Sequence, residues 1–236
     1  MVQVARRLSR VLFGSRFGSR FCVRHNYLML WSALKSLRKS GAAPAAAERR
    51  LHIGGQVRKE GWEVLDAIAG QAVDHLGHAQ DLGRFADQSF VAVYSSHCLE
   101  HLDFIDEVGA ALGEWYRVLA PGGRLYVSVP DLAALARLIL LPGLTLEGRL
   151  SVMKMQFGAH RDDYDYHKTG FDYEILRHFL QTAGFAQIER VDAFGLFEDY
   201  STLVSAGIPV SVNVTAVRPD DGSADGPADG AAQRFG

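Results

Sequence analysis

Side chains that could do chemistry follow two short apolar segments of this sequence. Ser95 and His97 follow the apolar residues 90–94, and Asp131 follows a second apolar segment, residues 124–129. An imidazole titrates close to neutral pH and can take or give a proton. His97 is therefore a candidate catalytic residue, for example as the base that takes a proton from a substrate hydroxyl.

The elements that position these residues are predicted to be a strand, a helix and a second strand. Residues 90–94 have the apolar, β-branched and aromatic pattern of a strand buried on both faces. Asp103 is a suitable N-cap for a helix whose apolar residues recur every three or four positions up to Leu119. Residues 121–123, Pro-Gly-Gly, end this helix. A unit of this length predicts parallel strands with a right-handed crossover.

The polar residues after the two strands fall where parallel sheets bind their ligands. In open parallel sheets, ligands lie beyond the carboxyl ends of the strands. The alternative is that these residues only form caps and turns, which are common at such positions. His101 follows the same strand and is a second candidate base, but we expect it to cap or brace the loop from Leu99 to Asp103, and we expect Glu100 to position that loop.

The composition indicates a globular protein with a small-molecule ligand. The chain of 236 residues can bury one sizeable core. The first 50 residues carry 11 Lys and Arg against one acid, whereas the rest carries 14 against 26 acids. An acidic body argues against nucleic acid and fits a small-molecule or saccharide acceptor better. No segment approaches the roughly 20 apolar residues that span a bilayer.

The two ends differ in composition from the body. Residues 1–49 form a basic extension and linker, and their Arg- and Ser-rich start fits a transit peptide, a membrane-surface helix or a solvated extension. Residues 219–236 are rich in Asp, Gly and Ala and are predicted to be disordered. Cys22 and Cys98 are too few for a disulfide framework. We therefore expect a cytoplasmic protein, or an organellar one if the start is a transit peptide.

Two strings in the centre of the chain resemble a known family. "SSHCLEHL" followed by "EWYRVLAPGGRLYVSVPDL" is similar to the second half of the S-adenosylmethionine-dependent methyltransferase fold, and in particular to type 11-like methyltransferase domains. The resemblance covers residues 50–218. It implies an α/β fold with a Rossmann-like, mostly parallel seven-stranded sheet, an antiparallel last strand and helices on both faces.

The resemblance also implies where S-adenosylmethionine would bind. Gly54 and Gly55 end the first predicted strand, where the family has a longer glycine-rich loop beside the methionine part of the cofactor. Asp66 ends the second strand, where the family has an acid on the ribose hydroxyls; its alternative role is a helix cap or turn. Ser95, after the fourth strand, completes this half of the donor site.

Two departures from the family pattern affect the same site. His78 stands where the family has an acid for the adenine amino group, and Asp81 could substitute for that acid or cap the loop. Only residues 56–61 separate the first two strands, although a parallel crossover usually needs a dozen or more residues. The first crossover helix is therefore predicted to be short or missing.

The irregular segment 157–172 mixes aromatic, acidic and histidine residues. The resemblance implies a lid over the cofactor and acceptor, with aromatic side chains that exclude water and His167 as a second catalytic candidate. Its histidines and aspartates could also be read as metal ligands. Their spacing matches no strong ligand pattern, so we expect no metal.

The leading interpretation is thus an S-adenosylmethionine-dependent methyltransferase that acts on a small molecule or saccharide. The alternative is a non-catalytic module that kept the fold and lost the donor site, which the shortened glycine loop and His78 favour. A nicotinamide oxidoreductase is disfavoured, because the chain lacks the Gly-x-Gly-x-x-Gly helix start that holds a pyrophosphate.

Overall fold

The computed structural model describes residues 48–220. The predictions for the basic segment up to residue 47 and for the tail from residue 221 lie outside the described residues, and the domain boundaries stay predictions. The described elements are β1 (Arg50–Ile53), β2 (Trp62–Asp66), β3 (His75–Leu76), β4 (Phe90–Ser96), η1 (Leu99–His101), α3 (Glu107–Val118), β5 (Leu119–Pro130), α4 (Leu132–Ile139), α5 (Leu146–Phe157), α6 (Tyr173–Thr182), β6 (Ala186–Val191), η2 (Tyr200–Thr202), β7 (Val204–Ser205), β8 (Ile208–Pro209) and β9 (Ser211–Val217).

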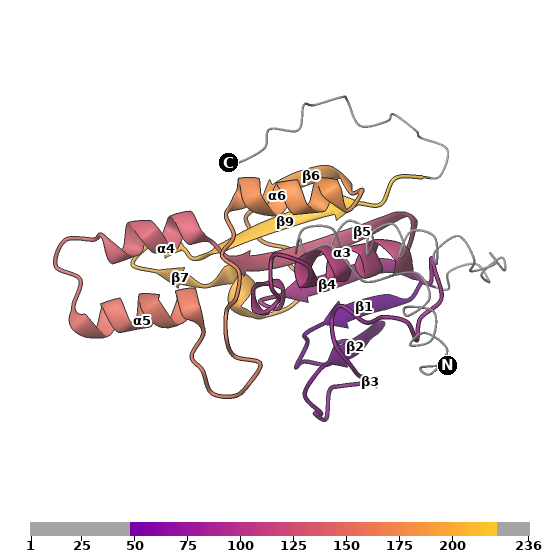
Figure 1. Ribbon diagram of the computed structural model, residues 1–236, viewed down its shortest axis with the longest axis horizontal. Helices are drawn as coiled ribbons and strands as arrows, with labels where there is room; N and C mark the ends of the chain where they lie inside the picture. The colour runs from indigo at the N-terminus through magenta and orange to yellow at the C-terminus, as the bar shows by residue number, and fades with distance from the viewer. Residues whose placement is uncertain (1–47, 221–236) are drawn as a thin grey trace, which may run out of the picture. The chain divides into compact units, whose positions relative to one another are not determined.

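Seven of these strands form one sheet in the order β3–β2–β1–β4–β5–β9–β6 (Figure 1). The strands from β1 to β5 pair in parallel. The last strand of the chain, β9, runs antiparallel to both of its neighbours, β5 and β6. This arrangement confirms the predicted fold class, including the antiparallel last strand.

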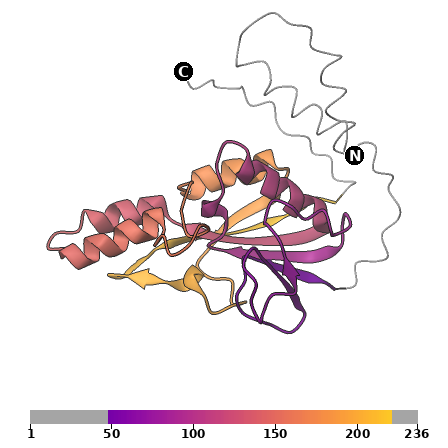
Figure 2. The same ribbon diagram turned by 60° about the horizontal axis from the view of Figure 1, so that its bottom comes forward.

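One face of the sheet is buried by α3 and α6, which lie together above the strands in Figure 2. Strand residues such as Val93 and Val127 meet Trp115 of α3 and Leu180 of α6 in one apolar cluster, and all four are fully buried. The indole Nε1 of Trp115 donates a hydrogen bond to the carbonyl of Ala79 at 2.9 Å. The amphipathic pattern that predicted these helices therefore also identified the face that they bury.

The opposite face is covered, in the part of the chain that the structure describes, by a coil that follows β6. Tyr94 and Trp62 project from the sheet on this face, and the ring of Phe197 packs on both at centroid distances of 4.6 and 5.3 Å. Lys59 donates a hydrogen bond to the carbonyl of Leu196, and its ammonium lies 5.3 Å from the Phe197 ring centroid. Aromatic side chains thus bury a surface that a crossover helix would otherwise cover, so the prediction of helices on both faces is wrong for this part of the sheet.

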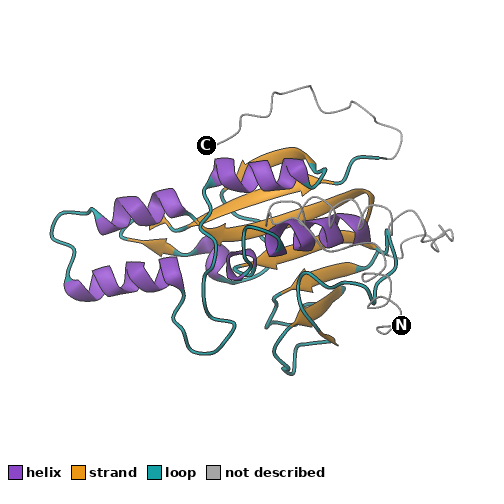
Figure 3. Ribbon diagram, in the orientation of Figure 1, coloured by secondary structure: helices purple, strands orange, loops and turns teal. Residues whose placement is uncertain are grey.

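The predicted absence of the first crossover helix is confirmed. Figure 3 shows coil alone between β1 and β2 and between β2 and β3. The first of these coils, residues 54–61, begins and ends with glycines at φ +74° and φ +78°. Glycine adopts this left-handed conformation without the steric cost of a Cβ atom. Two sharp turns therefore reverse the chain within eight residues, which is how the short connection closes.

The coil between β3 and β4 is held to α3 by one buried arginine. The guanidinium of Arg117 binds both carboxylate oxygens of Glu114, at 2.8 and 2.7 Å, and one oxygen of Asp87 at 2.6 Å. It also donates to the carbonyls of Leu82 and Phe85, each at 2.9 Å. This coil contains no helix of its own, so these contacts to Arg117 fix its backbone.

Helix α4 follows β5 directly and packs against α5 (Figure 1). Asp131, one of the polar residues at a strand end, caps α4 by accepting from the backbone nitrogens of Ala133 and Ala134 at 3.0 and 3.3 Å. Its second oxygen accepts from Arg190 at 3.0 Å. For Asp131, the cap alternative therefore accounts for the residue.

The start of α3 differs from the prediction. The helix begins at Glu107, and the side chain of Asp103 instead accepts a hydrogen bond from the backbone nitrogen of Ile105 at 2.7 Å. Phe104 and Ile105, expected on the buried face, are each 55% exposed. The reason is that Asp103 forms a local turn of its own, which delays the helix.

No helix in residues 48–220 is long and apolar enough to cross a membrane.

The Arg117 hydrogen bonds predict a large effect on stability. Arg117→Met should lower the free energy of unfolding by about 3–5 kcal/mol, because it leaves a mostly buried Glu114 without its cation. Arg177→Met on α6 is the matched control, since Arg177 is exposed and its nearest acid lies 3.9 Å away. Urea unfolding measures both; equal effects would contradict the proposed role of Arg117.

A second stability prediction concerns His52, which packs 4.3 Å from the Phe197 ring centroid. Burial lowers the pKa of His52 from 6.5 to about 4, against a smaller opposing effect of Asp199. Below pH 6.5 the His52 imidazole is therefore protonated in the unfolded chain, whereas in the folded chain it stays neutral down to about pH 4. Acidification from pH 7 to pH 5 should cost about 2 kcal/mol of stability through this group.

His52→Phe keeps a ring in the aromatic cluster and removes the titration. The unfolding free energy of this variant, measured in urea at both pH values, should fall less on acidification than that of the unchanged protein. The same fall in both proteins would show that His52 is not held neutral by the fold.

Candidate functional site

Two adjoining cavities open at the carboxyl ends of β1, β2 and β4. The smaller has a volume of about 420 Å³ and the larger of about 1050 Å³. Both lie where the parallel strands predicted a ligand. The residues that line both are Gly54, Gln56, His97, His101, Arg161 and Asp165.

Asp66 lines the smaller cavity from the end of β2. The residue is 8% exposed. One carboxylate oxygen accepts from the backbone nitrogen of Ile68 at 2.7 Å, and the other accepts from the side-chain amide of Gln56 at 2.9 Å. These two donors fix the orientation of the carboxylate toward the cavity, and each oxygen keeps a lone pair for a further donor.

The two glycines after β1 are required by close packing. A Cβ atom on Gly54 would lie 2.8 Å from the Cβ of Cys98, and one on Gly55 would lie 2.6 Å from the ring of His52. Such distances are too short for any side chain. Gly54 lines both cavities, whereas Gly55 lines only the larger one.

The remaining predicted donor-site residues lie in different places. His78 lines the smaller cavity, with its ring 6.0 Å from that of Tyr164. Asp81 lines neither cavity and accepts a hydrogen bond from the backbone nitrogen of Gly83 at 3.2 Å, as in its cap alternative. Ser95 is fully buried and lines neither cavity.

His97 lies at the boundary between the cavities with an unusual backbone conformation. Its φ of +53° is in the left-handed region, which non-glycine residues rarely adopt. The imidazole Nε2 lies 2.9 Å from the hydroxyl of Ser211, and Nδ1 lies 3.3 Å from a carboxylate oxygen of Glu100. Both nitrogens of this candidate base are therefore close to polar partners.

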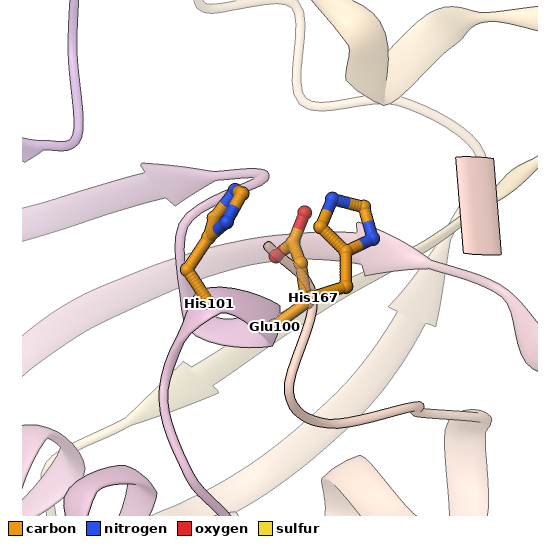
Figure 4. A group of neighbouring side chains, drawn as sticks. All are labelled: Glu100, His101 and His167. Carbon is orange, nitrogen blue, oxygen red and sulfur yellow. The ribbon is translucent and has the colours of Figure 1, made fainter. Parts of the chain in front are cut away.

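Three side chains converge beside His97. The possible ligand atoms of Glu100, His101 and His167 all lie within 4.8 Å of one another (Figure 4). Burial raises the pKa of the Glu100 carboxyl, but the neighbouring imidazoles of His97, His101 and His167 outweigh it, so that the pKa stays below its ordinary value. Burial lowers the pKa of His167, against the opposing effect of Glu100. The carboxylate is thus ionised among imidazoles.

The segment after α5, expected to form a lid, reaches this cluster through backbone hydrogen bonds. The backbone nitrogens of Lys168 and Thr169 both donate to the carbonyl of Glu100, at 2.8 and 3.1 Å. Of the aromatic residues expected to exclude water, Tyr164 lines the smaller cavity, whereas Phe171 is buried in the main core. His167 lines the larger cavity.

Sequence reasoning missed the convergence of Glu100, His101 and His167. The sequence assigns Glu100 to a loop, His101 to the same loop or to a base, and His167 to catalysis or to the ligands of its own segment, without joining the three. No local pattern joins these residues, because they come from η1 and from the coil after α5. A charged residue inside the apolar string "CLEHL" was the one available signal, since an unpaired charge is rarely buried without a reason.

Residues 59–127 match the family model described as a methyltransferase domain. The match runs from just before β2 into β5, and so includes Asp66, His97 and Glu100. No curated protein matches the sequence.

Several solved structures resemble the chain at low identity. A S-adenosylmethionine-dependent methyltransferase from Archaeoglobus fulgidus shares 17% identity over 85% of this chain and 95% of its own, with a TM-score of 0.48. A possible histamine N-methyltransferase from Thermotoga maritima shares 19% over 83% and 90%, with a TM-score of 0.43. The CurJ carbon methyltransferase shares 13% over 83% of this chain, with a TM-score of 0.46, and the alignment spans about half, 54%, of that protein.

The family match and the seven-stranded sheet with its antiparallel last strand both point to the methyltransferase fold. Residues 59–127 of this chain are therefore similar to a methyltransferase domain, in agreement with the family that the central strings resemble.

Proposed function

We propose that this protein is an S-adenosylmethionine-dependent methyltransferase that acts on a small-molecule or saccharide acceptor. The observation that carries the proposal is the pair of adjoining cavities, which share His97 and His101. Methyl transfer needs a donor and an acceptor aligned with each other and shielded from water. Two cavities with a common boundary can hold one reactant each.

The smaller cavity suits the donor. Asp66 can accept hydrogen bonds from ribose hydroxyls, while Gln56 and Ile68 hold its carboxylate in place. His78 and Tyr164 present rings to the same cavity, where a flat purine could stack. Gly54 lets the backbone come close to the methionine part of the cofactor.

The larger cavity suits the acceptor. His167 lines it, and His97 stands at the boundary with the donor cavity. Attack on the methyl carbon of a sulfonium is an in-line displacement with a reactive donor, so alignment and exclusion of water are the main tasks of the protein. A hydroxyl acceptor would also lose a proton, and the candidates that handle it are His97 and His167.

The alternative remains a non-catalytic module with a methyltransferase fold. One observation favours it: the amide of Gln56 already occupies a position on the Asp66 carboxylate. Calorimetry with S-adenosylmethionine separates the two functions. Absence of binding at millimolar donor would contradict the enzyme and favour the module.

The donor site is tested by Asp66→Asn, which keeps the shape of the side chain and removes its charge. The affinity for S-adenosylmethionine should fall by about 10–100-fold, because hydrogen bonds to a charged group are worth roughly 1.5–3 kcal/mol. Asp81→Asn is the matched control and should leave the affinity unchanged, since Asp81 lines neither cavity. Equal losses in both variants would contradict the assignment of Asp66.

The acceptor side is tested by His167→Ala, once a screen with labelled methyl donor has found an acceptor. We expect turnover to fall by at least about tenfold with donor affinity within twofold, since general acid–base groups contribute 10²–10⁴-fold. His160→Ala in the same segment is the control, because His160 is exposed and stacks on Tyr166. An unchanged rate with a lower melting temperature would mean that His167 only holds the coil.

A further inference from the structure

The Glu100 side chain is in a position that its present partners do not explain. The residue is 1% exposed, and neither carboxylate oxygen has a hydrogen-bond partner among the described residues. Nδ1 of His97 lies 3.3 Å from one oxygen, without the geometry of a hydrogen bond. A buried carboxylate is costly unless it is paired or coordinates a metal. Its two oxygens are therefore available to a ligand.

His101 has a nitrogen prepared for the same ligand. Its Nδ1 lies 3.2 Å from the backbone carbonyl of Tyr166, and a carbonyl can only accept, so this nitrogen carries the hydrogen. In the neutral ring Nε2 then keeps its lone pair. A backbone carbonyl that holds one imidazole nitrogen in this way is a common second partner of metal-binding histidines.

His167 completes the group from a different part of the chain. Its backbone nitrogen donates to the carbonyl of Phe157 at 3.0 Å, and the next backbone nitrogen, of Lys168, donates to the carbonyl of Glu100 at 2.8 Å. These hydrogen bonds hold the coil after α5 above η1. The rings of the two histidines are nearly perpendicular, with centroids 4.8 Å apart, and the Glu100 carboxylate lies beside them (Figure 4).

We propose that Glu100, His101 and His167 form a binding site for a divalent transition-metal ion, with Zn²⁺ as the best fit. Two imidazoles and one carboxylate are a donor set of catalytic zinc sites, whereas Mg²⁺ and Ca²⁺ prefer oxygen ligands alone. Ligand atoms around tetrahedral Zn²⁺ lie about 3.4 Å apart, given Zn–N and Zn–O distances of about 2.1 Å. Atoms that already lie within 4.8 Å of one another need only small side-chain rotations to reach this spacing.

The site is open to the cavities. Glu100, His101 and His167 all line the larger cavity, so coordination positions not taken by the protein face the proposed acceptor. His97 is then a positioning residue, because its Nδ1 lies beside the Glu100 oxygen and its Nε2 is held by Ser211. The proposal departs from the sequence-based expectation of no metal, which rested on ligand spacing within one segment.

A role for this metal in methyl transfer rests on the proposed function. An acceptor hydroxyl bound to Zn²⁺ is more acidic and can lose its proton to water. The oxygen then forms a bond to the methyl carbon, while the bond from that carbon to sulfur breaks and its electron pair neutralises the sulfonium. In this scheme His167 acts as a ligand of the metal.

Metal binding is tested on the full chain without donor or acceptor. Zn²⁺ is titrated by calorimetry, and Co²⁺ is titrated by visible absorption, whose d–d bands report the coordination geometry of the bound ion. The unchanged protein should bind one more equivalent than the His101→Ala/His167→Ala variant, which accounts for any ligands elsewhere in the chain. Equal stoichiometry and equal Co²⁺ spectra in these two proteins would overturn the site.

Single variants identify the ligands. Glu100→Gln and His167→Ala should each weaken this equivalent by more than about 100-fold, since even outer-shell partners are worth 10–100-fold. His178→Ala, an exposed histidine on α6, is the control and should leave Zn²⁺ affinity unchanged. Zn²⁺ should also raise the melting temperature of the unchanged protein and not that of Glu100→Gln. A shift of the same size in Glu100→Gln would mean that the carboxylate is only structural.

The test of Zn²⁺ binding can succeed or fail independently of the test of S-adenosylmethionine binding. Asp66→Asn should bind Zn²⁺ like the unchanged protein while it loses affinity for S-adenosylmethionine. A protein that binds the metal and not the donor would keep the metal site and reject the methyltransferase proposal, and the reverse outcome would do the opposite.

Discussion

The structure depends on one constraint, which is that β1, β2 and β3 are joined by coils too short to contain helices. A parallel sheet must have both faces covered, because its strands carry apolar side chains on each side. Here the missing cover comes from the other end of the domain, where Phe197 packs on Trp62 and Tyr94. Lys59 ties the first coil to the same segment through the carbonyl of Leu196. Aromatic packing thus replaces helix packing on this face.

The same constraint shapes the candidate site. A chain that reverses within eight residues brings Gly54 against Cys98 and Gly55 against His52, at distances that exclude any side chain. The start of the coil therefore packs closely against the segment after β4, which contains His97 and Glu100. The two adjoining cavities share residues from both segments. Close backbone packing, rather than a long glycine loop, defines the edge of the smaller cavity.

The predictability of each feature follows from how local its cause is. The strands and the cap at Asp131 were predictable because period and capping depend on neighbours in sequence. Asp66 was found through the family resemblance, and it does line a cavity. The cover by Phe197 and the grouping of Glu100 with His167 could not be predicted, because each joins segments that only the folded topology brings together. Asp103 shows that a local feature can also be mispredicted, because its side chain forms a turn and α3 starts later than expected.

The aromatic cover also sets an order of events during synthesis. The strands β1, β2 and β4 leave the ribosome long before Phe197 and the segment around it. Until then, Trp62 and Tyr94 lack the ring that packs on them in the finished domain. Chains emerge at about 5–20 residues per second, and apolar surface exposed in the meantime favours aggregation. The nascent first half of this domain is therefore expected to be a client of chaperones that bind aromatic surface, whereas the complete domain needs no such protection.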